Sequence, residues 1–458
     1  MQQDLTQGSI TRKLLGMAAF IGVGLVFQTA YFLVDLYFVA SQGATAIAGV
    51  GLAGNVFFLA MAASQMVAVG GLSLIARAIG GKTFEDAERT YDQALLLSLL
   101  LAGVILVLGY GLSRPALAVI AADGATVDAG VGYLNGFLPA VAVMFPSGVM
   151  VSALRAAGVV KAPMLIQMGT VILNVILAPV LVAGWGTGLP LGVFGAGLAS
   201  SISALAGLVA TIWLFSRVQT VIRAPVSFVR IDPGVWRRIV GIGLPSAGEF
   251  LLMFLTAGVV YSVIRHFGSE AQAGYGVGSR VMQAVFLPAM AVAFAVAPVA
   301  GQNFGAGRGD RVRRTVRDAA VISSILMLVL TLLCQLRPQL LVAPFAPDAR
   351  VVEIASTFLR IISLNFLATG LIFICSGAFQ ALGDTRPALI ASGSRLLTFA
   401  VPAVWISNQP WARLEHIWIA SACAVAIHAA IALLFLRREL RLKLAGLAPR
   451  AEAAVATG

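Results

Sequence analysis

Charged residues are scarce in this sequence. They make up 11% of its 458 residues, whereas hydrophobic residues make up 59%. Soluble globular proteins carry about 25% charged residues, so this composition excludes a water-soluble globule. The mean hydropathy of +0.95 agrees with that exclusion. The composition predicts an integral membrane protein whose chain crosses the bilayer many times.

Cysteine and histidine are also rare, with three residues of each. Cys334, Cys375 and Cys423 lie in apolar stretches and show no paired spacing, and no cluster of histidines lies near them. This pattern excludes a disulfide framework and gives no sign of a metal site. We therefore expect no cofactor and no bound metal beyond a transported or coupling ion.

Twelve long apolar stretches predict an all-α integral membrane fold with twelve transmembrane helices. Prolines within several of them are tolerated in membrane helices, because neighbouring groups satisfy the freed backbone. The predicted spans are residues 14–40, 46–71, 94–112, 131–153, 164–183, 193–215, 239–264, 273–299, 319–336, 357–380, 388–407 and 417–436.

Basic residues concentrate on one side of these spans. Of the 31 lysines and arginines, twenty-three fall in the termini and in alternate loops, five fall in the other loops, and Arg280, Arg360 and Arg395 fall within or at the edge of spans. Basic residues near span ends are retained in the cytoplasm, so both termini are predicted to be cytoplasmic. The same rule explains the net charge of +12 without nucleic-acid binding.

The two halves of the chain repeat each other at a constant offset of 225 residues. Gly43 matches Gly268, Ala48-Gly49 matches Ala273-Gly274, and Gly158 matches Gly383. An even number of spans in each half predicts a parallel repeat with its axis along the membrane normal. The predicted domains are an N-terminal six-helix bundle (1–215), a cytoplasmic linker (216–238), a C-terminal six-helix bundle (239–436) and a basic cytoplasmic tail (437–458).

Asp35 is the first functional candidate because it lies in the first apolar stretch, five residues before its end. A carboxylate inside a membrane span is costly, and it usually faces a cavity where it binds a cation or a proton. The alternative is that Asp35 only marks the outer end of the helix. Leu36, Tyr37 and Phe38 continue the apolar run beyond it, which favours the first interpretation.

Several motifs resemble those of multidrug and toxic compound extrusion (MATE) transporters. The resemblance covers about residues 5 to 445, and its strength lies in the order and spacing of the motifs together with the repeat. The motifs are Leu5-Thr6-x-Gly8-Ser9-Ile10, Gln28-x-x-Tyr31-x-x-x-Asp35, Gly43-x-x-Ala46-x-Ala48-Gly49, Asn174-Val175-Ile176-Leu177-Ala178-Pro179, Gly192-Val193-x-Gly195-Ala196-Gly197 and Gly301-Gln302-Asn303-x-Gly305-Ala306-Gly307.

The resemblance implies export of organic, often cationic compounds in exchange for entering H⁺ or Na⁺. It also implies that Asp35 and Asn174 take part in coupling to the cation. Gln28 and Tyr31 precede Asp35 by seven and four residues, so the three can share one stripe of a helix. We expect Gln28, Tyr31 and Tyr37 to line the substrate cavity.

Two departures from the family pattern concern the first half. Ala178 stands where many members carry an aspartate, and Phe20 stands where the first helix of many relatives has proline. A Na⁺ site needs several oxygen ligands with enough negative charge, whereas a single carboxylate suffices for a proton. The loss of one acid therefore favours H⁺ as the coupling ion.

In the second half, Glu249 is the only acidic residue well inside a span. Relatives place a comparable glutamate where this chain has Phe254, so the match is inexact. Glu249 is either a substrate or proton carboxylate in a shifted position, or a structural partner of an intramembrane arginine, for which Arg280 is the favoured choice. We include Glu249 and Arg280 among the predicted residues of the substrate cavity. His428, inside the last span, is interpreted as a satisfied core residue.

Two other functional classes are alternatives to a cation-coupled exporter. A flippase of lipid-linked or polysaccharide precursors would need a groove rich in arginine, and only Arg280, Arg360 and Arg395 are available. A membrane-embedded enzyme would need clustered acidic residues, which this sequence lacks. We expect a transporter rather than an enzyme, located in a bacterial inner membrane, acting as a monomer on small organic molecules, in contact with membrane lipid and not with nucleic acid.

Overall fold

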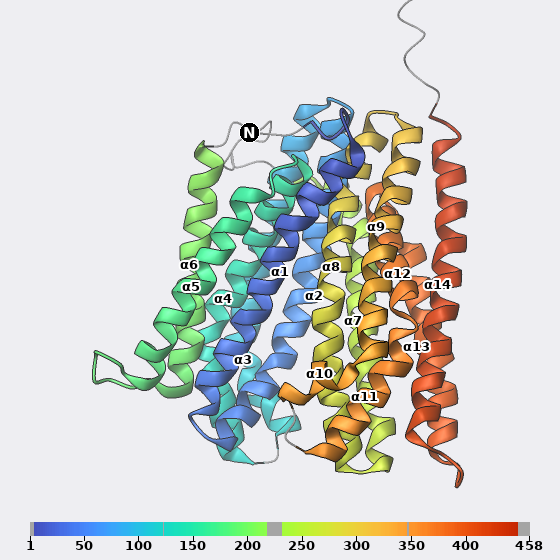
Figure 1. Cartoon of the computed structure of the whole chain (residues 1–458). Coiled ribbons are helices and arrows are strands. Elements are labelled where there is room, and N and C mark those ends of the chain that lie inside the picture. Colours follow the sequence, from blue (N-terminus) through green and yellow to red (C-terminus); the bar gives the residue numbers. More distant parts are fainter. Residues whose placement is uncertain (1–3, 122, 218–230, 346–347, 448–458) are drawn as a thin grey trace, which may run out of the picture. The chain divides into compact units, whose positions relative to one another are not determined.

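The structure is a computed structural model that describes residues 4–121, 123–217, 231–345 and 348–447, apart from the side chains of residues 32–36 and 120. All of its regular elements in these ranges are helices (Figure 1), which confirms the predicted all-α fold. The α-helices are α1 (Ile10–Ala40), α2 (Ala44–Gly80), α3 (Phe84–Ile120), α4 (Gly124–Ala156), α5 (Lys161–Ala183), α6 (Gly192–Arg217), α7 (Pro233–Ile264), α8 (Ser269–Gly305), α9 (Gly309–Leu336), α10 (Pro338–Val342), α11 (Ala349–Ser363), α12 (Phe366–Leu382), α13 (Arg386–Ser407) and α14 (Leu414–Leu444).

Eleven of the described helices are long and apolar enough to cross a membrane, and α11 and α12 together supply a twelfth span. The axes of α11 and α12 differ by 58° across the break between them. The predicted continuous helix over 357–380 is therefore wrong in this detail, because the span breaks at Leu364 and Asn365. The Asn365 Nδ2 donates a hydrogen bond to the Ala422 carbonyl on α14, at 2.6 Å, which holds the break against a neighbouring helix.

Many helices extend beyond the apolar spans expected from hydropathy. For example, α3 begins at Phe84, ten residues before the predicted start, and α14 continues to Leu444 through part of the predicted basic tail. Hydropathy detects only the part of a helix that lies in lipid, so it misses the polar turns that continue the helix into water. Residues 218–230 of the predicted linker and 448–458 of the predicted tail lie outside the described residues.

The helix boundaries reproduce the repeat seen in the sequence. Helices α2, α3, α4 and α5 begin at residues 44, 84, 124 and 161, and helices α8, α9, α11 and α13 begin at 269, 309, 349 and 386, each 225 residues later. Equivalent helices of the two halves therefore start at the same spacing along the chain, although the helix ends and the connections between them differ. This agreement confirms the predicted internal repeat.

Matching residues shape the turns of both halves. Gly43 and Gly268 precede α2 and α8 with φ angles of 101° and 94°, which residues with a Cβ atom rarely adopt. Asp123 and Asp348 cap α4 and α11, and their side chains accept hydrogen bonds from the amides of Thr126 and Arg350, both at 2.7 Å. The two halves thus carry the same residue at positions where the backbone conformation or a helix cap requires a particular residue type.

By their contacts, the helices fall into two compact units. Unit 1 comprises Val23–Leu244, and unit 2 comprises Leu5–Gly22 together with the chain from Pro245 onwards. These units differ from the two sequence halves, because the start of α1 belongs to unit 2 and the start of α7 belongs to unit 1. The predicted halves and the compact units are thus two different divisions of the chain.

Unit 1 is organised around α4, which packs against α2, α3 and α6 and is its most buried span. Tyr133 and Phe137 of α4 stack on each other with ring centroids 5.0 Å apart, and Phe57 of α2 contacts Phe137 at 5.7 Å. Aromatic pairs at such distances contribute beyond the area that they bury. They fix the side of α4 that faces α2.

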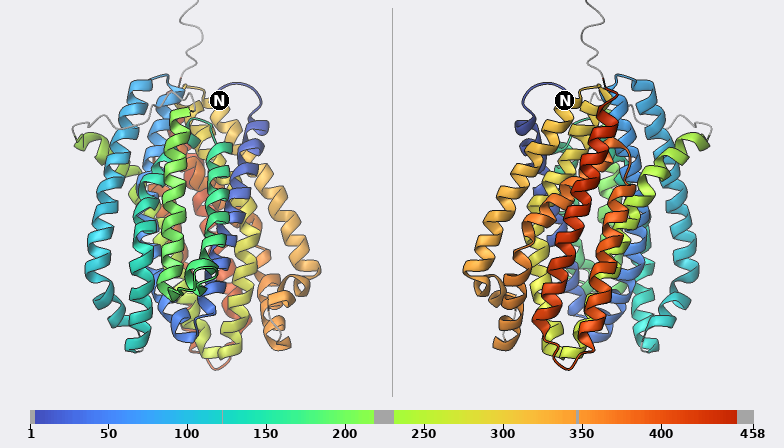
Figure 2. Two further views of the ribbon diagram at one scale, coloured as in Figure 1. Left: turned by 90° about the vertical axis from the view of Figure 1, so that its left-hand side faces the viewer. Right: turned by 90° about the vertical axis from the view of Figure 1, so that its right-hand side faces the viewer.

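Unit 2 has its most buried span in α8, which packs against α9, α11 and α12. An aromatic cluster lies at one end of its core: Tyr275 of α8 stacks on Trp418 of α14 at 5.6 Å, and Phe358 of α11 meets both rings edge-on. Figure 2 shows α13 and α14 side by side on the face turned to the viewer at the right.

The N-terminal segment before α1 is held by unit 2 through backbone hydrogen bonds. The Leu5 amide donates to Gln302 Oε1 at 3.0 Å, and Asn303 Nδ2 donates to the Leu5 carbonyl at 3.2 Å. Arg311 donates to the Gly8 carbonyl at 3.0 Å. Gln302 and Asn303 belong to one of the motifs that carry the family resemblance, and their structural role is to bind this segment.

The start of α7 is held by unit 1 in an equivalent way. The Asp232 carboxylate forms an ion pair with Arg89, and the Asp232 amide donates to Gln93 Oε1 at 3.0 Å. At Gly243, an added Cβ would lie only 1.8 Å from the Met66 carbonyl oxygen, so α7 and α2 touch backbone to backbone there. Only glycine permits this approach.

Candidate functional site

The contact between α4 and α6 places the polar residues around Asn174. An added Cβ on Gly136 would lie 2.4 Å from the Phe194 carbonyl oxygen, and one on Gly197 would lie 2.4 Å from the Tyr133 carbonyl oxygen. Glycine on both helices therefore allows their backbones to touch. Beside this contact, Ser201 Oγ donates to the Gly136 carbonyl at 2.5 Å, which fixes the rotation of α6.

The fixed rotation of α6 turns Ser200 toward α5. Asn174 Nδ2 donates to Ser200 Oγ at 3.3 Å, and Ser200 Oγ donates to the Ala196 carbonyl at 3.2 Å. Asn174 is fully buried, and its Oδ1 makes no hydrogen bond with any other described residue. A buried amide oxygen without a donor is costly, so it is poised to accept a proton donor or to contact a cation.

Ala178 lies one turn after Asn174 and is also fully buried. The surroundings of Asn174 on α5 therefore contribute neutral oxygen atoms and no negative charge of their own.

Asp35 and its expected neighbours all lie on α1, which runs without a break from Ile10 to Ala40. The spacing of Gln28, Tyr31 and Asp35 places them on one helical stripe. Gln28 is exposed, Tyr31 is half-buried and makes interactions of its own, and Tyr37 is 73% exposed with its ring against Phe38. The side chain of Asp35 lies outside the described residues, so its role stays a prediction.

In unit 2, Glu249 is half-buried on α7 and accepts a hydrogen bond from Ser376 Oγ of α12 at 2.6 Å. It forms no ion pair with Arg280 or any other residue in the part of the chain that the structure describes. The predicted pairing of Glu249 with Arg280 is therefore wrong. Arg280 is exposed on α8, and a neutral hydroxyl takes the role expected of the arginine.

The sequence does not indicate the surroundings of three polar residues of unit 2, Arg395, Tyr275 and His428. For His428 it predicts a satisfied core residue. His428 is indeed 4% exposed, but its Nδ1 has no hydrogen-bond partner among the described residues. No signal in the sequence indicates which polar groups of different helices meet.

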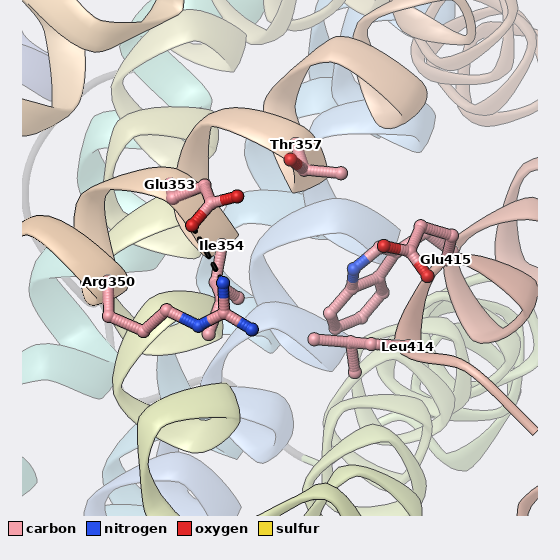
Figure 3. Close-up of a pocket in the computed structure, with 7 residues that line it drawn as sticks. Arg350, Glu353, Ile354, Thr357, Leu414 and Glu415 are labelled. Atoms are coloured by element: carbon pink, nitrogen blue, oxygen red, sulfur yellow. Dashed lines mark hydrogen bonds and ion pairs between the residues drawn. The ribbon is translucent and has the colours of Figure 1, made fainter.

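A small cavity of about 90 Å³ opens between the start of α11 and the start of α14 (Figure 3). Its lining includes Arg350 and Glu353, which already pair with each other at 2.8 Å, and the Trp418 ring. Ligand pockets for drug-sized compounds hold about 300–1,000 Å³, so this cavity is too small for such a compound. Within the described ranges, no three histidine, cysteine, aspartate or glutamate side chains come together as a metal site.

Comparisons with known proteins agree with this fold. The profile of the MatE family matches residues 21–180 and 245–406, one match in each half of the chain. The multidrug export protein MepA of Staphylococcus haemolyticus (strain JCSC1435) is 26% identical over 417 residues, which cover 90% of either chain. MepA of Staphylococcus aureus (strain MRSA252) is 24% identical over 425 residues, covering 91% of this chain and 92% of the relative.

Two solved structures show the same arrangement of helices. A MATE protein in complex with MaL6 matches with a TM-score of 0.89 at 23% sequence identity, and a MOP superfamily transporter from Pyrococcus furiosus matches with 0.88 at 23%. Each match covers 96% of this chain and 98% of the other.

A twelve-span helical fold built from two repeats, with polar groups buried inside its spans, defines a multi-pass membrane transporter rather than an enzyme. The family match spans more than half of the chain. The protein belongs to the MatE family of transporters.

Proposed function

We propose that this protein is a secondary active antiporter that exports organic, often cationic compounds by alternating access, in exchange for an entering cation. The observation that carries the proposal is family membership over both repeats, together with relatives that are named multidrug export proteins. The buried Asn174 on α5 and the position of Asp35 on α1 support it.

The coupling ion in this proposal is H⁺ rather than Na⁺. A Na⁺ ion needs several oxygen ligands with sufficient negative charge to replace its hydration shell. Ala178 removes one carboxylate from the neighbourhood of Asn174, and the amide oxygen of Asn174 carries no net charge. Protonation of Asp35 from outside then rearranges the N-terminal bundle and releases the substrate outward, and reopening inward lets the proton leave.

The proposal also covers the setting of the protein. The excess of basic residues in alternate loops supports cytoplasmic termini. The membrane that we propose is a bacterial inner membrane. We expect the monomer to be the functional unit, surrounded by lipid, with small organic molecules as its substrates and no cofactor. Gln28, Tyr31, Tyr37, Glu249 and Arg280 are the proposed contacts in the substrate cavity.

Uptake of ethidium into inverted vesicles tests the coupling. A pH gradient, acid inside, and a Na⁺ gradient are imposed separately on vesicles with the wild type, Asp35→Asn or Asp128→Asn. Asp128 lies in an exposed ion pair with Arg114, so Asp128→Asn is the matched control. We expect the pH gradient alone to drive uptake in the wild type and the control, and not in Asp35→Asn.

Uptake that requires Na⁺ would contradict H⁺ coupling. Uptake by Asp35→Asn at the wild-type rate would contradict the role of Asp35. A second pair of variants tests Asn174: Asn174→Ala removes the unpartnered oxygen, whereas Ser200→Ala removes only the hydroxyl to which Asn174 donates. Loss of uptake in the first and its retention in the second is the expected result.

A further inference from the structure

Three arginines gather on the exposed face of α9, close to its start. The side chains of Arg314 and Arg317 are 64% and 73% exposed, and Arg313 is exposed as well. Residues three and four apart share one face of a helix, so the three guanidinium groups project from little more than one turn. The buried face of α9 packs against α8 and α12 (Figure 1). The arginines therefore lie on the side of α9 that is turned away from the core of unit 2.

Aliphatic side chains continue this face of α9 toward the other end of the helix. From Val321 to Leu336, at about 1.5 Å per residue, the apolar part of the face is roughly 22 Å long, which is most of the ~30 Å thickness of a hydrocarbon core. Arg317 precedes Val321 by about one turn, or about 6 Å. The arginines thus lie at the level of lipid headgroups, in line with a surface for acyl chains. Its side chains, each about half exposed, include Val321, Ile325, Leu328, Val329 and Leu332.

The three guanidinium groups keep their hydrogen-bond donors available. Within the described ranges, Arg313 forms no ion pair and no side-chain hydrogen bond. Arg314 and Arg317 each lie 3.7 Å from a carboxylate oxygen of Asp318, which is too long for a hydrogen bond. Three positive charges and the one negative charge of Asp318 leave this group of four side chains with a net charge of +2. The cluster therefore offers both charge and donors to an anion.

Other side chains hold the start of α9 in place. Asp318 Oδ2 accepts a hydrogen bond from Thr11 Oγ1 of α1 at 2.8 Å. Arg311 donates to the Gly8 carbonyl at 3.0 Å and to Asn303 Oδ1 at 2.8 Å. These bonds connect α9 to the segment before α1 and to the end of α8 without any of the three exposed arginines. The arginines are therefore not needed for this connection, and their positions on the helix are fixed by it.

We propose that Arg313, Arg314 and Arg317 bind the headgroup phosphate of an anionic phospholipid, whose acyl chain lies along Val321 and Ile325. Guanidinium groups match phosphate oxygens in a bidentate way. A zwitterionic headgroup carries its own cation beside the phosphate, so the net charge of +2 favours a lipid without one, such as phosphatidylglycerol. A soluble anion would gain nothing from the aliphatic face that continues the cluster. This lipid site goes beyond the proposed export function and does not depend on it.

Photoactivatable lipids test the proposal at the site itself. Phosphatidylglycerol and phosphatidylcholine that carry the same diazirine acyl chain are added, one at a time and at equal mole fraction, to phosphatidylcholine nanodiscs that contain the full-length protein. After illumination, mass spectrometry measures the labelling of residues 318–329. We expect phosphatidylglycerol to label this stretch at least about fivefold more than phosphatidylcholine, since one basic residue near a membrane surface raises the affinity for anionic lipid by about that factor.

Three variants separate the site from the general charge of the protein. Arg313→Gln combined with Arg317→Gln leaves one arginine beside Asp318 and no net charge, so the labelling ratio of the two lipids should fall to near one. Arg237→Gln combined with Arg238→Gln is the matched control, because it removes two exposed arginines from another helix, α7, and it should leave the ratio unchanged. Asp318→Asn removes the negative charge and should raise labelling by phosphatidylglycerol severalfold, a gain that a folding defect does not produce.

Several outcomes would overturn the inference. These are equal labelling by the two lipids in the wild type, a ratio that the α9 variant leaves unchanged, or weaker labelling by phosphatidylglycerol in Asp318→Asn. An equal fall of the ratio in the α7 control would show only a general attraction between anionic lipid and a basic protein. Loss of the preference in excess inorganic phosphate, at constant ionic strength, would assign the arginines to a soluble anion and would overturn the choice of a lipid.

Discussion

The contact between Gly136 and Gly197 should control both the stability of unit 1 and the position of Asn174. In Gly136→Ala, the new methyl group would lie 2.4 Å from the Phe194 carbonyl oxygen and 2.8 Å from the Leu198 amide nitrogen. Ordinary van der Waals contact begins at about 3.4 Å, so α4 and α6 must separate by about 1 Å. Overpacking of this kind costs about 1–3 kcal/mol.

Separation of the helices also weakens the hydrogen bonds beside the contact. Ser201 Oγ donates to the Gly136 carbonyl at 2.5 Å and accepts from the Ala140 amide at 3.0 Å. Interhelical hydrogen bonds in membranes average about 0.6 kcal/mol each. The higher helix propensity of alanine offsets the total by about 1 kcal/mol. We expect a net loss of about 2 kcal/mol for Gly136→Ala.

The matched control is Gly132→Ala, one turn earlier on α4. An added Cβ at Gly132 meets no atom within 4 Å, so only the gain in helix propensity remains. Thermal stability in detergent, followed as the fraction of monodisperse protein after heating, should fall by about 5 °C for Gly136→Ala and stay level or rise for Gly132→Ala. Equal midpoints for the two variants would refute the reasoning.

Two other predictions concern the segments held at the starts of α7 and α1. Amide hydrogen bonds from Val235 and Gly234, together with Arg89, hold the pKa of Asp232 below its ordinary value of 3.8. The Asp232 carboxylate therefore stabilises the start of α7 above about pH 4, and this stabilisation is lost as the pH falls through the lowered pKa. The protection factors for hydrogen exchange of residues 233–244, which are relative to the exchange of an unstructured chain at the same pH, should fall in acid for the wild type and lose this pH dependence in Asp232→Asn. Identical profiles of the protection factors would contradict the assignment. Thr11 Oγ1 donates to Asp318 Oδ2 at 2.8 Å, so Thr11→Val should destabilise the start of α1 by about 1 kcal/mol, seen as faster exchange near residue 11. The exposed Thr29, whose hydroxyl donates to the Leu25 carbonyl of its own helix, gives the control Thr29→Val, which should not change exchange near residue 11.

The repeat and the order of the helices could be predicted from the sequence because they depend on local residue types. Gly43 and Gly268 stand where the backbone adopts a positive φ, and Asp123 and Asp348 stand where a helix needs a cap. Such requirements leave the same residue at equivalent positions of both halves. Hydropathy likewise detects each apolar span. The break at Leu364 and Asn365 was not predictable, because neither proline nor glycine marks it and Asn365 bonds to a distant helix.

The candidate site was less predictable for a related reason. A polar residue within a span, such as Asn174, can be recognised by its composition alone, but its partner Ser200 lies on another helix. Charge complementarity suggested Arg280 as the partner of Glu249, and this rule overlooks neutral donors such as Ser376.

Helices α1 and α7 each begin in one unit and end in the other, and near the change of unit they carry different residues at equivalent positions of the repeat. Helix α1 changes units after Gly22, and α7 changes units at Pro245. Proline has no amide hydrogen, so α7 lacks the hydrogen bond from residue 245 to the Gly241 carbonyl. At the equivalent position α1 has Phe20, which keeps its amide hydrogen. Kinks in helices arise mainly at proline. Bending where a helix changes units therefore costs less in α7 than in α1, although the two helices are repeats of each other.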